Sequence, residues 1–179
     1  MTTPPDFSVG QVLTAAAMDA VGLWLVKTDT VGTGVSSHTV TGAFTADYVN
    51  YRVLYTGGTA SGTGGIRFQL GGSTSTYYNT VNYSLWSGGG VTSVTNNNSV
   101  GYWQYAGAVD SNANAFMCID VYEPNVARST RFQGSWVQVD SGGTTAGIHR
   151  TNTAYTDFTI TPDSGTLTGG TIYIYGYRP

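Results

Sequence analysis

Lys27 is the only lysine and Glu123 the only glutamate in this chain of 179 residues. These two residue types cover the surfaces of most soluble helices. In their place the sequence carries 25 glycines, 13 tyrosines and long runs of serine, threonine and asparagine. Threonine and tyrosine suit a pleated sheet, while glycine, asparagine and serine supply its turns. The composition therefore predicts an all-β protein.

The balance of charged and apolar residues restricts the class of protein further. Only 9% of the residues are charged, against about a quarter in ordinary globular domains. Because 40% are hydrophobic, the chain is expected to fold around one core and not to remain disordered. A surface covered by hydroxyls and amides repels neighbouring molecules weakly, which is typical of proteins that work inside an assembly.

Charge and hydropathy also exclude several kinds of partner. The net charge is −3, and the scattered arginines form no basic stripe, so a nucleic-acid partner is not expected. The sequence has neither a run of 18 apolar residues nor the pattern of a signal peptide, which predicts no membrane insertion and no export signal of its own. The single cysteine, Cys118, is expected to be a small core residue.

Short apolar and aromatic runs separated by glycine, serine and asparagine predict a sandwich or barrel, and about ten strands favour two packed antiparallel sheets. Ile66, Phe68 and Leu70 alternate with polar residues, as in a strand with one buried face. The ten strands are expected over residues 23–27, 38–44, 48–55, 66–70, 80–86, 100–109, 116–122, 131–139, 158–161 and 171–177. Paired glycines, among them Gly142 and Gly143, are expected in the turns.

One short helix is expected before the first strand. Thr14 can cap a helix over residues 15–21, which Gly22 would end. Leu13, Ala17 and Val21 would form one narrow apolar stripe on it, able to pack on the β domain or to dock onto another subunit. Residues 1–22 are thus predicted to be a docking segment, and residues 23–179 the β-sandwich domain.

The last predicted strand has apolar or amphipathic residues on both faces. Ile172 and Ile174 point one way, while Tyr173, Tyr175 and Tyr177 point the other. The three tyrosines are a candidate oligomer contact, because tyrosine supplies a large contact area with a polar tip. The alternative is a strand buried on both sides.

No catalytic signature is present, so the chain is predicted not to be an enzyme. The two histidines, His38 and His149, lie in no nucleophile motif and are expected on surface loops. Asp120 and Glu123 are three positions apart on a predicted strand, which places them on opposite faces. No cofactor is expected.

Residues 110–114 match the start of an EF-hand calcium loop, with Asp110, Asn112 and Asn114 at alternate positions. Ala115 and Val121, however, occupy the positions at which an EF-hand needs glycine and glutamate. An ordinary asparagine-rich turn is therefore favoured, and no metal site is predicted. Aromatic residues near loops are instead candidate contacts for a receptor or glycan, and core packing is the alternative for about half of them. These aromatic residues are Tyr77, Tyr78, Trp86, Tyr102 and Trp103.

The opening residues 5–19 read Pro-Asp-Phe-Ser-Val-Gly-Gln-Val-Leu-Thr-Ala-Ala-Ala-Met-Asp. They resemble a segment of the tail and fibre proteins of tailed bacteriophages, in which a Phe-x-x-Gly-x-Val-Leu-Thr-Ala-Ala phrase precedes a β domain. Residues 22–26 and 170–177 resemble such proteins as well. The resemblance implies a virion structural protein with a jelly-roll-like sandwich, often a homotrimer, that in some members carries the host-recognition surface.

Together these features predict a tail-associated protein of a bacteriophage virion, such as a fibre, tail-tip or minor tail protein, assembled in the host cytoplasm. Its expected partners are copies of itself, other phage structural proteins and a glycan of the host surface. One alternative within the same particle is a capsid decoration or head-fibre protein. Alternatives of other classes are a free carbohydrate-binding module and an envelope-degrading enzyme.

Overall fold

The computed structural model describes residues 22–97, 100–111 and 114–177, and within these ranges the chain is entirely β. The expected helix, with Leu13, Ala17 and Val21, lies outside the described residues. The ranges that are described contain no helix long and apolar enough to cross a membrane. The strands are β1 (Leu23–Thr30), β2 (His38–Val40), β3 (Asn50–Ala60), β4 (Gly64–Leu70), β5 (Tyr77–Leu85), β6 (Thr92–Asn97), β7 (Trp103–Val109), β8 (Asn114–Tyr122), β9 (Thr130–Val137), β10 (Ser141–His149), β11 (Phe158–Pro162), β12 (Leu167–Thr168) and β13 (Thr171–Tyr177).

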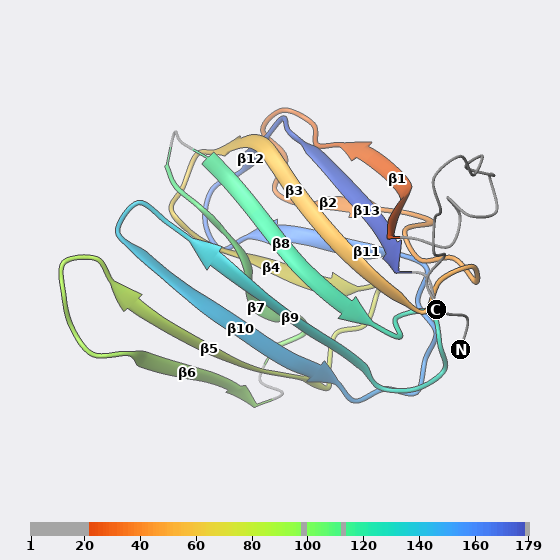
Figure 1. Cartoon of the computed structure of the whole chain (residues 1–179). Helices are drawn as coiled ribbons and strands as arrows, with labels where there is room; N and C mark the ends of the chain where they lie inside the picture. The colour runs from red at the N-terminus through yellow and green to blue at the C-terminus, as the bar shows by residue number, and fades with distance from the viewer. Residues whose placement is uncertain (1–21, 98–99, 112–113, 178–179) are drawn as a thin grey trace, which may run out of the picture.

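These strands form one hydrogen-bonded antiparallel sheet that folds into two layers (Figure 1). The wide layer has the order β1-β13-β3-β8-β9-β10-β5-β6, and β12 continues the line of β13 beside β3. The narrow layer, β2-β11-β4-β7, lies behind it in the figure. The layers join at β8, which pairs with β7 through Ala115–Met117 and with β9 through Cys118–Tyr122. The predicted all-β, antiparallel class is confirmed, but one continuous sheet forms both layers in place of two separate sheets.

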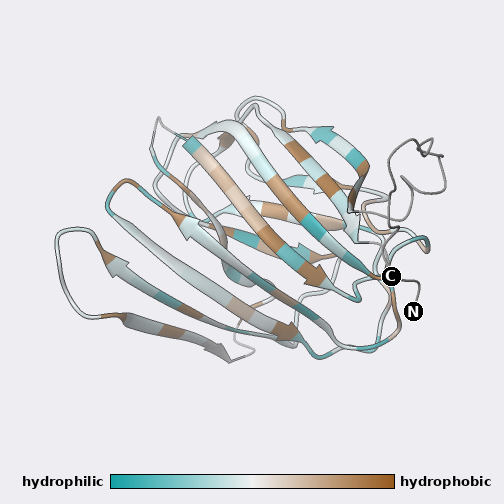
Figure 2. Cartoon of the chain, viewed as in Figure 1, coloured by the Kyte–Doolittle hydropathy of each residue, from teal (hydrophilic) through white to brown (hydrophobic). Residues whose placement is uncertain are grey.

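The core lies between the two layers and is dominated by aromatic rings. Trp103 of β7 stacks on Phe132 of β9, with 4.3 Å between ring centroids, and so ties the narrow layer to the wide one. Phe68 stacks on Phe158 at 4.6 Å inside the narrow layer. The alternation predicted for Ile66, Phe68 and Leu70 is confirmed, since all three are fully buried. Figure 2 shows the same alternation of apolar and polar residues along β3, β8 and β13.

The glycine-rich strand β10 is the main departure from the expected secondary structure. Gly142 and Gly143 were expected in a turn, but both lie inside β10 and neither has a positive φ. A Cβ atom on Gly143 would lie 2.2 Å from the carbonyl oxygen of Asn82 and 3.0 Å from the Trp136 ring. Here glycine allows close packing between strands instead of a reversal of the chain.

His149 also departs from expectation, because it is fully buried at the end of β10 and not on a surface loop. Its ring stacks on Tyr77 with 4.2 Å between centroids, and its Nε2 lies 2.7 Å from the Tyr155 hydroxyl. The Thr76 hydroxyl lies 3.1 Å from Nδ1. Burial lowers the pKa of His149, although a hydrogen bond with the backbone of Thr76 acts in the opposite direction.

Candidate functional site

The outer face of the wide layer, which points away from the core, carries the most distinctive surface of the described chain. Cross-strand pairing aligns its side chains in rows that run perpendicular to the strands. One row runs Tyr173, Leu54, Cys118, Ser135, Thr144, Asn82. The next row runs Leu25, Tyr175, Arg52, Asp120, Gln133, Ala146, Thr80. Along both rows, the β1–β13 side is aromatic and aliphatic, while the β9–β5 side has small polar residues.

A partly buried ion pair on the outer face separates these two sides. The Arg52 guanidinium donates two hydrogen bonds to the Asp120 carboxylate, with Nε–Oδ1 and Nη2–Oδ2 distances of 2.8 and 2.9 Å. The Tyr177 hydroxyl donates a third, 2.6 Å from Oδ1. Burial raises the pKa of Asp120, but the hydrogen bonds from Arg52 and Tyr177 outweigh it and hold that pKa below its ordinary value. Burial and the bond to Asp120 raise the pKa of Tyr177 to about 12.

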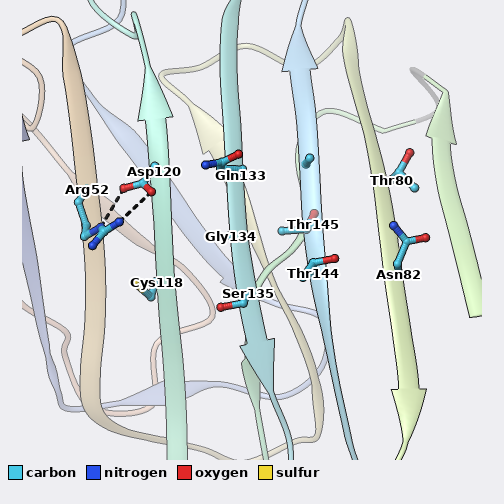
Figure 3. Close-up of a pocket in the computed structure, with 11 residues that line it drawn as sticks. Arg52, Thr80, Asn82, Cys118, Asp120, Gln133, Gly134, Ser135, Thr144 and Thr145 are labelled. Atoms are coloured by element: carbon cyan, nitrogen blue, oxygen red, sulfur yellow. Dashed lines mark hydrogen bonds and ion pairs between the residues drawn. The ribbon is translucent and has the colours of Figure 1, made fainter. Parts of the chain in front are cut away.

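Beside this ion pair the face is hollowed into a shallow cavity of about 410 Å³. Figure 3 shows its lining side chains arriving from β3, β8, β9, β10 and β5, with Arg52 and Asp120 on one side. Apart from that neutralised pair, the lining consists of hydroxyls, amides and small residues. These uncharged residues are Thr80, Asn82, Cys118, Gln133, Gly134, Ser135, Thr144, Thr145 and Ala146.

A second depression of about 360 Å³ continues the first along the strands, since Thr80 and Ala146 line both. At its far end the Arg150 guanidinium lies over the Tyr78 ring, 4.3 Å from the centroid. The two hollows together form what we call the outer groove, lined by residues of β9, β10 and β5 and bounded by the Arg52–Asp120 pair. It follows β10 and β5 from Thr144 to the neighbourhood of Arg150.

An apolar shelf borders the other end of the outer groove, formed by Phe116, Val137 and Trp86. Phe116 and Val137 are two residues along their strands from Cys118 and Ser135, on the same face, and Trp86 follows the end of β5 with its ring against Gly142. Trp86 is 59% exposed and Val137 is 60% exposed. The Trp86 indole N–H donates to the Gln138 carbonyl at 3.1 Å, and its backbone N–H donates to Asp140 at 2.9 Å.

The Trp86 ring rests on the backbone of β10. A Cβ atom on Gly142 would lie 2.5 Å from Cη2 of the indole, so only glycine leaves room for the ring there. The indole is therefore a fixed platform at the surface and not a freely rotating side chain.

The five aromatic residues proposed for receptor or glycan contact divide between surface and core. Tyr77 and Trp103 are fully buried, so they are unavailable to a surface ligand. The remaining candidates are Tyr78, Trp86 and Tyr102. Tyr102 is half-buried away from the outer groove, with the Arg67 guanidinium 4.7 Å from its ring centroid. Tyr78 lines the far hollow of the groove, whereas Trp86 lies against Gly142 on the shelf beyond the other end.

The tyrosine ladder of β13 lies at the opposite side of the same face. Ile172 and Ile174 are fully buried, while Tyr173, Tyr175 and Tyr177 are half-buried and point outward, as the alternation predicted. Tyr173 and Tyr175 stack on each other at 6.4 Å. Leu25 and Leu23 of β1 stand beside Tyr175 and Tyr177 and are 54% and 40% exposed. We call the outward-facing residues Leu23, Leu25, Tyr173, Tyr175 and Tyr177 the leucine–tyrosine surface.

Three acidic side chains that the sequence singled out are engaged in structural contacts. Asp120 is held by Arg52, whereas Glu123 pairs with Arg128 at 3.0 Å on a separate turn. Asp110 of the calcium-like sequence accepts a hydrogen bond from the backbone N–H of Val139. Among the described residues, no three His, Cys, Asp or Glu side chains gather in a way that could hold a metal ion.

Cys118 was expected in the core but lies half-buried on the outer face, because Met117 and Ile119 take the inward positions of β8. The polar residues of the outer groove were not recognised from the sequence as a site. The alternation of small polar residues with buried ones in β5 and β9 was the only signal available, and β10 was not recognised as a strand.

Comparison of the chain with family models, with curated proteins and with solved structures gave no match.

Proposed function

We propose that this chain is a structural protein of a bacteriophage virion, associated with the tail as a fibre, tail-tip or minor tail protein. On this proposal it acts by binding and not by catalysis, assembles in the host cytoplasm and contacts copies of itself and other virion proteins. The observation that carries the proposal is the leucine–tyrosine surface, supported by the phage-like opening phrase at residues 5–19.

The leucine–tyrosine surface has the character of a subunit contact. Leu23 and Leu25 are exposed on β1, an edge strand of the wide layer, beside Tyr177 and Tyr175. Covering side chains of this kind with another molecule is favourable by about 25 cal/mol per Å² of apolar area removed from water. Aromatic residues are also enriched in the centres of interfaces. The low charge of the whole chain removes much of the repulsion that would oppose such contacts.

The position of this surface fits the expected docking segment. Strand β1 begins at Leu23, directly after residues 1–22, so the apolar surface starts where the proposed segment joins the domain. A homotrimer built through β1 and β13 would cover the surface and gather three docking segments on one side of the assembly. Closed rings of this kind are common among symmetric oligomers.

We also infer a jelly-roll-like connectivity. Strands of the first half pair with strands of the second half in nested order, β3 with β13, β4 with β11 and β5 with β10. This nesting is the pattern of a jelly roll, in which a long hairpin wraps across two layers. The hairpin of β8 and β9 lies at the centre of the nest and inserts between β3 and β10.

Immunogold labelling tests the proposed location. Phage particles are prepared from cells in which the chain is expressed from its native genome, and they are labelled with antibody against residues 23–179. Gold on the tail is the expected result, with particles lacking the gene as the control. Gold confined to the head would replace the tail assignment by a capsid decoration or head-fibre protein. Particles without gold would contradict a virion role.

A further inference from the structure

We propose that the outer groove and its apolar shelf bind a neutral polysaccharide, laid along β10 and β5 with one sugar ring stacked on Trp86. The proposal goes beyond a role in assembly, because it concerns the side of the face opposite the leucine–tyrosine surface. The two ideas can therefore fail separately.

The Trp86 platform is the first argument. An indole that is more than half exposed, held by its N–H to Gln138 and seated on Gly142, has lost its conformational freedom before any ligand arrives. A rigid aromatic surface gives contact area at low entropy cost. The ring faces of sugars, made of C–H groups, fit such a flat apolar surface, whereas their edges carry hydroxyls.

The lining of the outer groove supplies partners for those hydroxyls. Asn82 and Gln133 each offer an amide with both donors and an acceptor, and Ser135 and Thr144 each offer a hydroxyl that can donate and accept. A sugar hydroxyl also donates and accepts, so this lining matches it without any charged group. All four side chains are exposed on the outer face beside the shelf.

The charges favour a neutral ligand. Arg52 and Asp120 bound the groove as a bidentate pair, so neither presents an uncompensated charge to it. The other residues that line the 410 Å³ cavity are uncharged. Arg150 lies only at the far end, over Tyr78, where it can affect no more than the last part of a bound chain.

The shape favours a polymer over a small molecule. The groove is shallow and open, and the six-residue step from Gly142 to Ile148 spans about 20 Å at roughly 3.4 Å per residue. Sites for small ligands usually enclose most of the ligand surface. An open track with a platform at one end allows a long chain to enter from the side.

Affinity electrophoresis of the purified full chain tests the proposal. The gels contain a neutral polysaccharide (dextran, galactomannan or arabinogalactan) or anionic alginate, and an array of bacterial surface glycans extends the set. Retardation by at least one neutral glycan is expected. Trp86→Ala should weaken this binding about tenfold or more, as should the double variant Asn82→Ala with Thr144→Ala. Tyr102→Ala, which alters a half-buried residue outside the groove, should bind like the unaltered chain.

Fluorescence quenching gives a second readout that does not depend on the gel. Bound neutral glycan should protect one exposed tryptophan from iodide, and this protection should disappear in Trp86→Phe. Thermal melting confirms that each variant is folded.

Three results would overturn the proposal: folded chain that binds none of these glycans, binding that survives in Trp86→Ala, or binding to alginate alone that Arg150→Gln removes. If the chain binds no glycan but immunogold labels the tail, the glycan-binding proposal fails and the virion role stands. If the chain binds glycan but is absent from particles, the virion role fails and the glycan-binding proposal stands.

Discussion

The same residue type has different roles at different positions in this chain, and the burial of the side chain determines the role. Trp86 and Trp103 both stand near strand ends, and the sequence made both candidates for glycan contact. The structure buries Trp103 among Phe68, Tyr77 and Phe132, whereas Trp86 lies on the surface. Local sequence could not separate them, because the partners of Trp103 come from β4, β5 and β9.

This difference predicts unequal effects on stability. Trp103→Ala should lower the free energy of unfolding by about 3–5 kcal/mol, since it leaves a cavity between the two layers. Trp86→Ala should lower it by no more than about 1 kcal/mol, because the indole is mostly exposed. Urea unfolding followed by circular dichroism measures both values. Similar losses for the two variants would contradict the placement of one ring in the core and the other on the surface.

His149 makes stability depend on pH. Burial lowers its pKa in the folded chain below the unfolded value of about 6.5, so the unfolded state binds the proton more readily. Stability should therefore be constant above about pH 6.5 and fall as the pH drops below it. Urea unfolding at a series of pH values from 7.5 to 5.5 measures the slope.

The control for this effect is His149→Gln, which keeps a polar group near Thr76 and Tyr155 but cannot titrate. The variant should be less stable than the unaltered chain at pH 7.5 and should lose most of the slope below pH 6.5. An equal slope in both proteins would assign the pH dependence to other groups.

At the scale of secondary-structure elements, the alternation of apolar and polar residues predicted strands correctly, whereas the structural role of the glycines in β10 could not be predicted. Each of the ten predicted strands overlaps an observed one, and the outward tyrosines of β13 were placed correctly because one face of that strand is buried. Strands β6, β10 and β12 were missed. In β10 the glycines accommodate Trp86, Trp136 and the backbone of β5, and these are contacts between distant segments that a local pattern does not contain.

The role of glycine in β10 predicts a position-specific cost. Gly143→Ala should destabilise the chain by about 1–3 kcal/mol, since its Cβ would clash with the Asn82 carbonyl and the neighbouring strands would have to move. Gly90→Ala is the matched control, because nothing lies within 4 Å of its Cβ position and its φ is not positive. The control should be neutral or slightly stabilising. A neutral Gly143→Ala in thermal melts would argue against the close packing of β5 and β10.

At the scale of the whole molecule, the outer face of the wide layer is divided between two kinds of contact. The leucine–tyrosine surface lies at β1 and β13, and the outer groove lies at β9, β10 and β5, with the Arg52–Asp120 pair between them. The proposed assembly would therefore cover one side and leave the other accessible. The sequence indicated the tyrosines, but the groove required knowledge of which strands are neighbours.

This division predicts the behaviour of the chain in solution. The purified chain should sediment as a trimer or larger assembly, and Leu25→Asp should shift it toward the monomer by burying an unpaired charge at the contact. Val139→Asp is the control, because Val139 is 79% exposed on the β9–β10 turn, away from β1 and β13. Analytical ultracentrifugation of the unaltered chain, Leu25→Asp and Val139→Asp measures the oligomeric state of each. A monomeric unaltered chain, or an oligomer that persists in Leu25→Asp, would contradict the role given to this surface.

A cryo-electron microscopy map of the chain within phage particles tests the central claim most directly, because one observation locates the chain and both sides of its outer face. The map is expected to show tail-associated copies with Leu25 and Tyr175 covered by a neighbouring subunit and with Trp86 facing solvent at the end of an open groove. Particles that lack the chain, or copies in which β1 and β13 face solvent while the groove is covered by virion protein, would contradict it.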